Sequence, residues 1–302
     1  MTELLLTDAG LETVLLFQEG IDLPHFAAFP LLESDAGRAA LRRYYEPFLE
    51  LADERGVGLV LSTPTWRANP EWGGRLGYDD ERLAAVNRDA VAFLDELRAG
   101  RHAVVVEGCI GPRGDAYRPT MRMTADEAER YHAPQLRAFA DGGCTRAAAL
   151  TLTYVEEAVG IVRAATAVGI PIVVGFTVEL DGCLPSGLSI EHAIEAVDAA
   201  TDGAALGFMI NCAHPTHFVD ALPEGSARDR IHALRANAST KSHEELDASE
   251  TLDSGDPDDL AARYVGLRSR LPALRVLGGC CGTDIRHVTK ICDAWIDGSR
   301  LL

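Results

Sequence analysis

The chain has 302 residues, 47% of them hydrophobic, so it can bury a core large enough to fold without stabilising cross-links. Its 28 basic and 46 acidic residues give a formal charge of −18, which argues against nucleic acid or an anionic membrane surface as a partner. No apolar run approaches the roughly 18 residues of a membrane span, and the N-terminus lacks a secretory signal pattern. The composition predicts a cytoplasmic protein that acts on small molecules, and it leaves the oligomeric state open, a homo-oligomer included.

Short runs rich in Val, Ile and Leu alternate along the chain with longer amphipathic segments, which is typical of βα units around a parallel sheet. Eight runs are candidate strands, and most have the short, continuous apolar character of strands that are covered on both faces: 4–7, 57–62, 103–107, 147–152, 170–176, 206–210, 231–235 and 274–277. Helices are expected at 79–99, 124–141, 155–168, 189–201, 256–270 and 284–295. Eight such units predict an α/β protein with a single (β/α)8 TIM barrel over residues 1–302.

Capping residues and one biased segment add detail to this prediction. Thr124 and Glu127 have the spacing of a capping box, and Ser189 and Asp256 have the same position before their helices. A long acidic loop at about 239–258 follows the seventh strand. Loops of this length in a compact domain are usually functional or disordered, so the segment is expected to form a lid or rim, with plain solvated surface as the alternative.

Three cysteines are the strongest chemical signal of the chain. Cys212 follows the sixth expected strand, and Cys280 and Cys281 follow the eighth. Barrel strands end at one common mouth, so the three sulfur atoms can converge there. Three thiolates leave one position of a tetrahedral zinc site open, as in catalytic rather than structural sites. The sequence therefore predicts Zn²⁺ held by these three cysteines.

The other cysteines and the residues after each strand complete the expected mouth. Seven cysteines, two of them adjacent, do not suggest a disulfide framework. Cys109 is a candidate for facing substrate, whereas Cys144, Cys183 and Cys292 are expected to be inert. Polar residues follow most of the strands: Asp8, Thr63, Thr65, Thr151, Thr153, Thr177, Glu179, Asn211 and Asn237. Such residues at strand ends are typical of a barrel active site.

Motifs in order along nearly the whole chain resemble one known family. They are Asp8-Ala-Gly-Leu-Glu-Thr13, Gly111-Pro112, Asn211-Cys212, Asn237 and Gly278-Gly-Cys-Cys-Gly-Thr283. In these motifs the chain resembles the zinc-dependent homocysteine S-methyltransferases. The resemblance implies a (β/α)8 barrel, zinc on Cys212, Cys280 and Cys281, and contact between Asp8 and the amino-acid part of a thiol substrate.

The activity that the resemblance implies is methyl transfer from a small onium donor to a zinc-activated thiol, homocysteine giving methionine. S-methylmethionine, S-adenosylmethionine and a betaine are the candidate donors, because the barrel uses the whole length and leaves no domain for a corrinoid or a folate. Predicted catalytic residues are Asp8 and Asn211. Predicted substrate-binding residues are Asp8, Glu12, Thr63, Thr177, Glu179 and Asn237. Trp66, Trp72, Tyr78 and Tyr117 are candidates for facing a cationic donor.

The chain departs from the family pattern at the fourth strand. Members of that family carry a glutamate there that holds the substrate ammonium group, and Leu150 occupies this position when Glu157-Ala158 is aligned with the family's Glu-Ala pair. A leucine cannot pair with an ammonium. Either another acid such as Glu107, Glu179 or Asp181 replaces it, or the acceptor thiol lacks that amino group.

Two other functions compete with methyl transfer. A zinc hydrolase on the same barrel would hold water at the open metal position, but it predicts a histidine-rich set of ligands and a general base, which this sequence does not offer clearly. A non-enzymatic thiol switch would form a vicinal disulfide between Cys280 and Cys281. That alternative leaves Cys212 and the polar mouth without a role.

Overall fold

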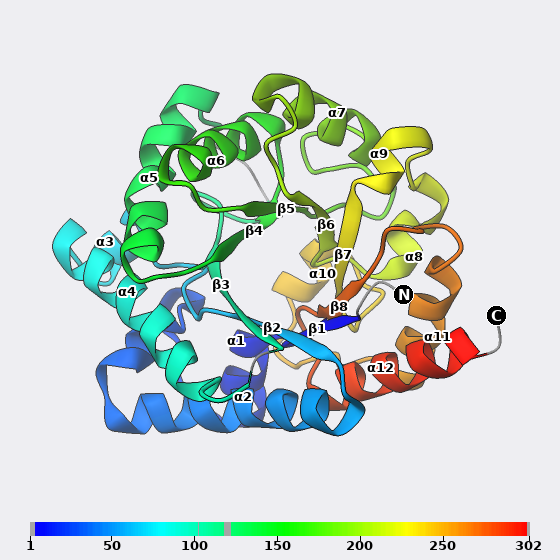
Figure 1. Ribbon diagram of the computed structural model, residues 1–302, viewed down its shortest axis with the longest axis horizontal. Coiled ribbons are helices and arrows are strands. Elements are labelled where there is room, and N and C mark those ends of the chain that lie inside the picture. The colour runs from blue at the N-terminus through cyan, green and yellow to red at the C-terminus, as the bar shows by residue number, and fades with distance from the viewer. Residues whose placement is uncertain (1–3, 102, 118–121, 301–302) are drawn as a thin grey trace.

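The computed structural model describes residues 4–101, 103–117 and 122–300, and a closed barrel of eight parallel strands lies at its centre (Figure 1). The strands are β1 (Leu5–Thr7), β2 (Gly58–Ser62), β3 (Val104–Ile110), β4 (Arg146–Leu152), β5 (Ile172–Phe176), β6 (Gly207–Asn211), β7 (Ile231–Ala236) and β8 (Val276–Gly279). Each pairs with the next, and β1 closes the barrel against β8, with Leu6 opposite Leu277. The (β/α)8 barrel predicted from the sequence is confirmed.

Every expected strand is present, and the differences lie at the strand ends. β3 continues to Ile110, because Gly108, Cys109 and Ile110 pair with residues of β4. Cys109, expected just past this strand, therefore lies within it. β6 ends at Asn211 and β8 ends at Gly279, so Cys212 and Cys280 directly follow two strands, as predicted.

Helices ring the barrel, as Figure 1 shows. They are α1 (Leu11–Thr13), α2 (Asp35–Arg55), α3 (Pro70–Arg75), α4 (Asp80–Leu97), α5 (Ala125–Asp141), α6 (Val155–Val168), α7 (Ile190–Thr201), α8 (Pro215–Phe218), α9 (Gly225–Asp229), α10 (His243–Asp247), α11 (Pro257–Leu267) and α12 (Ile285–Arg300). Short π- and 3₁₀-helical turns cover Val14–Gln18, Pro24–Phe26, Phe29–Glu33 and Val219–Ala221. None of the described helices is long and apolar enough to cross a membrane.

The local signals read from the sequence act where they were expected. Thr124 and Glu127 form a reciprocal capping box at α5, and the side chains of Ser189 and Asp256 cap α7 and α11. The 21-residue α2 was not among the expected helices; it begins after Ser34, whose side chain accepts a hydrogen bond from the Gly37 amide. These caps satisfy amide groups that a helix leaves unpaired at its first turn.

Two apolar layers support the barrel. The larger layer lies between the strands and the surrounding helices, and a smaller one fills the barrel interior: Val60, Cys109, Ala148, Leu150, Val173, Met209, Ala233 and Val276. Part of the acidic segment folds into α10, with a second capping box between Ser242 and Glu245. His243 of α10 lies 2.6 Å from the carbonyl oxygen of Cys212, so this segment covers the barrel mouth beside β6.

Candidate active site

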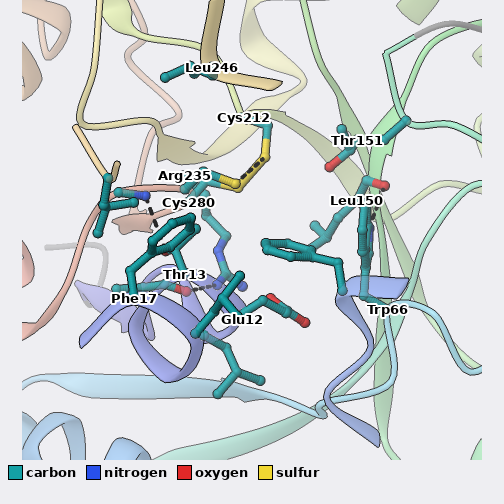
Figure 2. A pocket seen from close by; sticks show the side chains of 18 of the residues that line it. Glu12, Thr13, Phe17, Trp66, Leu150, Thr151, Cys212, Arg235, Leu246 and Cys280 are labelled. Atoms are coloured by element: carbon teal, nitrogen blue, oxygen red, sulfur yellow. Dashed lines mark hydrogen bonds between the residues drawn. A yellow bond between two sulfur atoms is a disulfide. The ribbon is translucent and has the colours of Figure 1, made fainter. Parts of the chain in front are cut away.

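A cavity of about 400 Å³ opens at the carboxyl ends of the strands (Figure 2). Its lining comes from the loops after β1, β2, β3 and β8, from the ends of β4 and β7, and from Cys212. The acidic segment adds further residues, among them Ser239, Leu246, Asp247 and Asp253. The volume is within the usual range of pockets for small molecules. The position matches the face where barrel enzymes carry their chemistry.

Three sulfur atoms gather on one side of this cavity. The Sγ atoms of Cys212, Cys280 and Cys281 all lie within 4.8 Å of one another, and they are the one group of three or more potential metal-ligating side chains found among the described residues. Cys212 and Cys280 form a disulfide, and the Cys281 sulfur lies 3.9 Å from that of Cys212. The expectation of no disulfide is therefore wrong for this pair. The cause is the convergence of β6 and β8, which brings the two Cα atoms to 5.4 Å, within disulfide range.

The backbone around the sulfurs is held in an uncommon conformation. Cys212 has a φ of 53°, in the left-handed region that few residues other than glycine adopt. Its carbonyl oxygen accepts hydrogen bonds from Asn237 Nδ2 at 3.0 Å and Thr177 Oγ1 at 3.2 Å. Strained residues of this kind persist where the surrounding contacts fix them, which is common at functional sites.

Glycines bring the other two cysteines to the same place. A Cβ atom at Gly278 would lie 1.8 Å from Thr7 Oγ1, and one at Gly279 would lie 2.0 Å from Thr283 Oγ1. No side chain fits at either position, because β8 packs closely against the end of β1 at Gly278 and against Thr283 of its own following turn at Gly279. Gly282 leaves the turn with a φ of 80°, which glycine adopts without strain.

A buried ion pair lies beside the sulfurs. Arg235 of β7 contacts Asp8 Oδ1 at 3.0 Å and donates hydrogen bonds to Ser62 Oγ at 2.8 Å and to the carbonyl oxygen of Gly279 at 3.1 Å. The Tyr44 hydroxyl lies 3.1 Å from Asp8 Oδ2. Burial raises the pKa of Asp8, while Arg235 and Tyr44 oppose this effect. The cysteines, Asp8 and Arg235 are called the sulfur wall below.

Aromatic side chains form another part of the lining. We call Phe26, Trp66, Arg67, Tyr117 and Leu150 the aromatic wall, and a side-chain hydrogen bond between Tyr117 and Cys281 joins it to the sulfur wall. Trp66 Nε1 donates to the carbonyl oxygen of Leu150 at 3.4 Å, and the Leu150 side chain lines the cavity. The Arg67 guanidinium lies 3.6 Å from the ring centroid of Trp72, and burial lowers the pKa of Arg67 to about 10.

Glu12 points into the cavity from the turn after β1 (Figure 2). Burial raises the pKa of its carboxyl group to about 7, and the hydrogen bond that opposes this comes from its own backbone amide. No cation among the described residues forms an ion pair with it. A partly desolvated carboxylate without a cation is well placed to receive a positively charged ligand.

The predicted site residues fall into two groups. Asp8, Glu12, Thr63 and the three cysteines line the cavity. The other four lie behind this lining. Asn211 is bonded through both side-chain atoms to Thr151, Thr177 and Asn237 bond to the Cys212 carbonyl, and Glu179 lies 3.3 Å from His243 Nδ1. Residues of this second group do not line the cavity themselves but hold Cys212 and Thr151, which do.

None of the three acids suggested to replace the strand-four glutamate lines the cavity. Glu107 is bonded to Arg146 at 2.5 Å inside the barrel, and Asp181 accepts from the Cys183 amide in a surface turn. Cys109 does line the cavity, as do Trp66 and Tyr117 among the aromatic candidates. Trp72 and Tyr78 instead pack outside the lining, where Tyr78 bonds to Glu33.

Arg235, Arg67 and Phe26 are the residues of the two walls that the sequence prediction missed. Arg235 carried a usable signal, because a charged residue near the end of an otherwise apolar strand must find a buried partner. Arg67 lies in a loop after β2, and nothing in its sequence context indicates that it turns toward the mouth.

The fold and the site define a TIM-barrel protein with a three-cysteine cluster at the carboxyl ends of its strands. The sequence profile described as Homocysteine S-methyltransferase matches residues 5–295, and the chain belongs to this family. The Homocysteine S-methyltransferase YbgG of Bacillus subtilis strain 168 is 26% identical over 234 residues, covering 70% of this chain and 68% of that protein.

Solved structures resemble the whole chain. The metallated form of the homocysteine methyltransferase MmuM from Escherichia coli has a TM-score of 0.73 and 17% identity, covering 97% of this chain and 96% of that chain. An oxidized form of the same protein has a TM-score of 0.74 and 19% identity, covering 95% and 94%. At these identities the likeness establishes the shared fold.

Proposed function

We propose that this chain is a zinc-dependent S-methyltransferase that moves a methyl group from a small onium donor to homocysteine, giving methionine. The observation that carries the proposal is the cluster of three cysteine sulfurs within 4.8 Å of one another, beside a cavity of about 400 Å³ at the catalytic face of the barrel. Membership of the homocysteine S-methyltransferase family supports the reaction class.

The donor set fits zinc. Thiolates select soft or borderline metal ions. The three thiolates from the turns after β6 and β8 leave one position of a tetrahedral site for a fourth ligand. A bound zinc ion would supply the Lewis acidity that keeps the acceptor thiol deprotonated at neutral pH. Cys212 and Cys280 must be reduced before they can serve as ligands, because a disulfide sulfur carries no thiolate.

The chain's own residues have separate roles in this proposal. The ion pair between Arg235 and Asp8 joins the ends of β7 and β1 and fixes the floor of the cavity beside the sulfurs. Trp66 and Tyr117 offer ring faces and edges to a cationic donor in a largely desolvated space. Holding donor and acceptor in line can contribute roughly 7–11 kcal/mol to catalysis, and this positioning is the main task of both walls.

The test is direct. Reduced protein is loaded with zinc, incubated with homocysteine and, separately, with S-methylmethionine, S-adenosylmethionine and glycine betaine, and the methionine formed is measured. We expect about one zinc per chain and methionine with one of the donors. Cys183→Ser is the matched control, since Cys183 lies outside the cavity lining. Zinc-loaded protein that forms no methionine with any of these donors would contradict the proposal.

The competing functions have less support. A zinc hydrolase needs a general base and favours histidine ligands, and no histidine in the described part of the chain lines the cavity. A vicinal switch requires a bond between Cys280 and Cys281, whereas the disulfide joins Cys280 to Cys212 and leaves Cys281 free. This disulfide is better explained as an oxidised state of the proposed metal site.

A further inference from the structure

We propose that Glu12 and Arg67 together bind the amino-acid end of the acceptor, with the ammonium group on Glu12 and the carboxylate on Arg67. The inference rests on the proposed function, because it assigns the groups that hold an acceptor whose thiol lies at the cysteine cluster. It also gives a reason why the chain can carry Leu150 where related proteins are expected to have a glutamate.

The first observation is that two opposite charges line one cavity without meeting. Glu12 and Arg67 both belong to the lining, yet no ion pair joins them or links either to another described residue. Each affects the pKa of the other, although Asp115 of the same lining has a larger effect on Arg67 and Arg235 has a larger effect on Glu12. A zwitterion placed between them compensates both charges at once, which neither water nor a singly charged ligand does.

The second observation is the contrast between the two acids of the cavity after β1. Asp8 already has a cation at 3.0 Å and a tyrosine hydroxyl at 3.1 Å, so its negative charge is compensated within the protein. Glu12 has neither kind of partner. An incoming ammonium group therefore gains more at Glu12 than at Asp8, where it would have to compete with the Arg235 guanidinium.

The third observation is that the Arg67 guanidinium is held in place and still has an unused hydrogen-bond donor. Its guanidinium lies 3.6 Å from the Trp72 centroid and 4.6 Å from that of Trp66, and one terminal nitrogen donates to the Gly114 carbonyl at 3.3 Å. These contacts fix the plane of the group. Its Nε atom is buried without a hydrogen-bond partner in the described part of the chain. Arg67 therefore retains donor capacity, and a fixed guanidinium is suited to bidentate binding of a carboxylate.

The cysteine cluster, Glu12 and Arg67 follow one another along the cavity lining in the order that an amino acid with a γ-thiol requires. The turn that carries Glu12 packs against the cysteine turn, because the Gly282 amide donates a hydrogen bond to Thr13 Oγ1 at 3.2 Å. Arg67 lies farther along the lining, on the rings of Trp66 and Trp72 in the loop after β2. An acceptor whose sulfur lies at the cysteine cluster can then place the ammonium and carboxylate groups of its α-carbon near Glu12 and Arg67.

Three thiols test the proposal: homocysteine, 4-mercaptobutyrate, which lacks the ammonium group, and 3-aminopropanethiol, which lacks the carboxylate. For each, kcat and KM are measured with the methyl donor that supports turnover, and binding without donor is measured by calorimetry. In the unmodified protein we expect homocysteine to exceed both analogues in kcat/KM by roughly 10- to 100-fold, the usual value of a hydrogen bond to a charged group.

The variants should separate the two contacts. Glu12→Gln should lower kcat/KM for homocysteine and 3-aminopropanethiol by roughly 10-fold or more and leave 4-mercaptobutyrate nearly unchanged. Arg67→Met should do the reverse: it should lower kcat/KM for homocysteine and 4-mercaptobutyrate and leave kcat/KM for 3-aminopropanethiol nearly unchanged. Arg67→Lys keeps the charge and should recover part of the loss. Glu195→Gln, on the exposed side of α7, is the control for removing an acid.

The outcomes distinguish this inference from the proposed function. If the protein methylates all three thiols equally, or if each variant affects all three by the same factor while zinc content and melting temperature are unchanged, the assignment of Glu12 and Arg67 is wrong and methyl transfer stands. If no thiol is methylated by zinc-loaded protein, the proposed function itself fails. Homocysteine affinity measured by calorimetry that is equal in Glu12→Gln and unmodified protein also overturns the ammonium contact.

Discussion

The two walls of the cavity differ in how they are built. The sulfur wall consists of residues at or next to strand ends, held by glycine contacts and by the buried pair of Arg235 and Asp8. The aromatic wall consists mainly of loop residues, Trp66 and Arg67 after β2 and Tyr117 after β3, with Leu150 at the end of β4. On the proposed function, the reaction chemistry belongs to the rigid wall and the choice of acceptor belongs to the loops, where substitutions disturb the barrel less.

The largest effect is expected from the cysteines of the sulfur wall. Cys281→Ser should lose bound zinc and reduce methyl transfer by more than about 100-fold, because changes to residues that only contact a metal ligand already cost 10- to 100-fold. Zinc content and initial rates provide the measurement. Arg67→Met on the aromatic wall should keep its zinc; a full zinc complement in Cys281→Ser would show that Cys281 is not a ligand.

Oxidation should also act on the sulfur wall alone. With Cys212 and Cys280 joined, one thiol of the cluster remains, so oxidised protein should bind no zinc and form no methionine until a thiol reductant is added. Thiol titration should show two more reactive thiols after reduction, in parallel with zinc uptake. Stoichiometric zinc in protein whose disulfide is intact would refute the shared role of these cysteines.

The buried ion pair gives a smaller effect that is measured as stability. Arg235→Met leaves Asp8 buried without its cation, which should lower the free energy of unfolding by about 3–5 kcal/mol. Arg228→Met is the control, since its pair with Asp229 is exposed and should contribute at most about 1 kcal/mol. Denaturant unfolding compares the two. Equal losses would mean that Arg235 does not organise the sulfur wall.

The smallest effect concerns Glu12 and pH. Its pKa is about 7 in the folded chain against 4.5 as the ordinary value, so between these pH values the folded state binds more protons than the unfolded state. Stability should therefore fall as pH rises from about 4.5 to 7, by at most about 3 kcal/mol and by less where solvent in the cavity screens the charge. The test measures the free energy of unfolding of the metal-free protein and of metal-free Glu12→Gln across this pH range. In the variant, this contribution to the fall of stability with pH should be absent.

Much of the fold could be predicted because its signals are local. Most strands are continuous apolar runs, and the helices at 124–141, 155–168 and 189–201 have caps or clear periodicity within their own residues. The α2 helix was missed, although Ser34 caps it and Gly56 ends it, because its polar content gives a weak apolar pattern. The cysteine cluster was also within reach of the sequence, since strand ends of a barrel meet at one mouth.

The sequence by itself therefore determined the barrel, the two strands that cysteines directly follow, and the family. Only the tertiary structure decided that Cys212 pairs with Cys280, that Arg235 neutralises Asp8 across the barrel, and that Glu12 and Arg67 share a cavity without touching. The physical reason is range. Apolar periodicity and capping act between residues a few positions apart, whereas the partner of a charge is set by side chains that approach from strands and loops far along the chain.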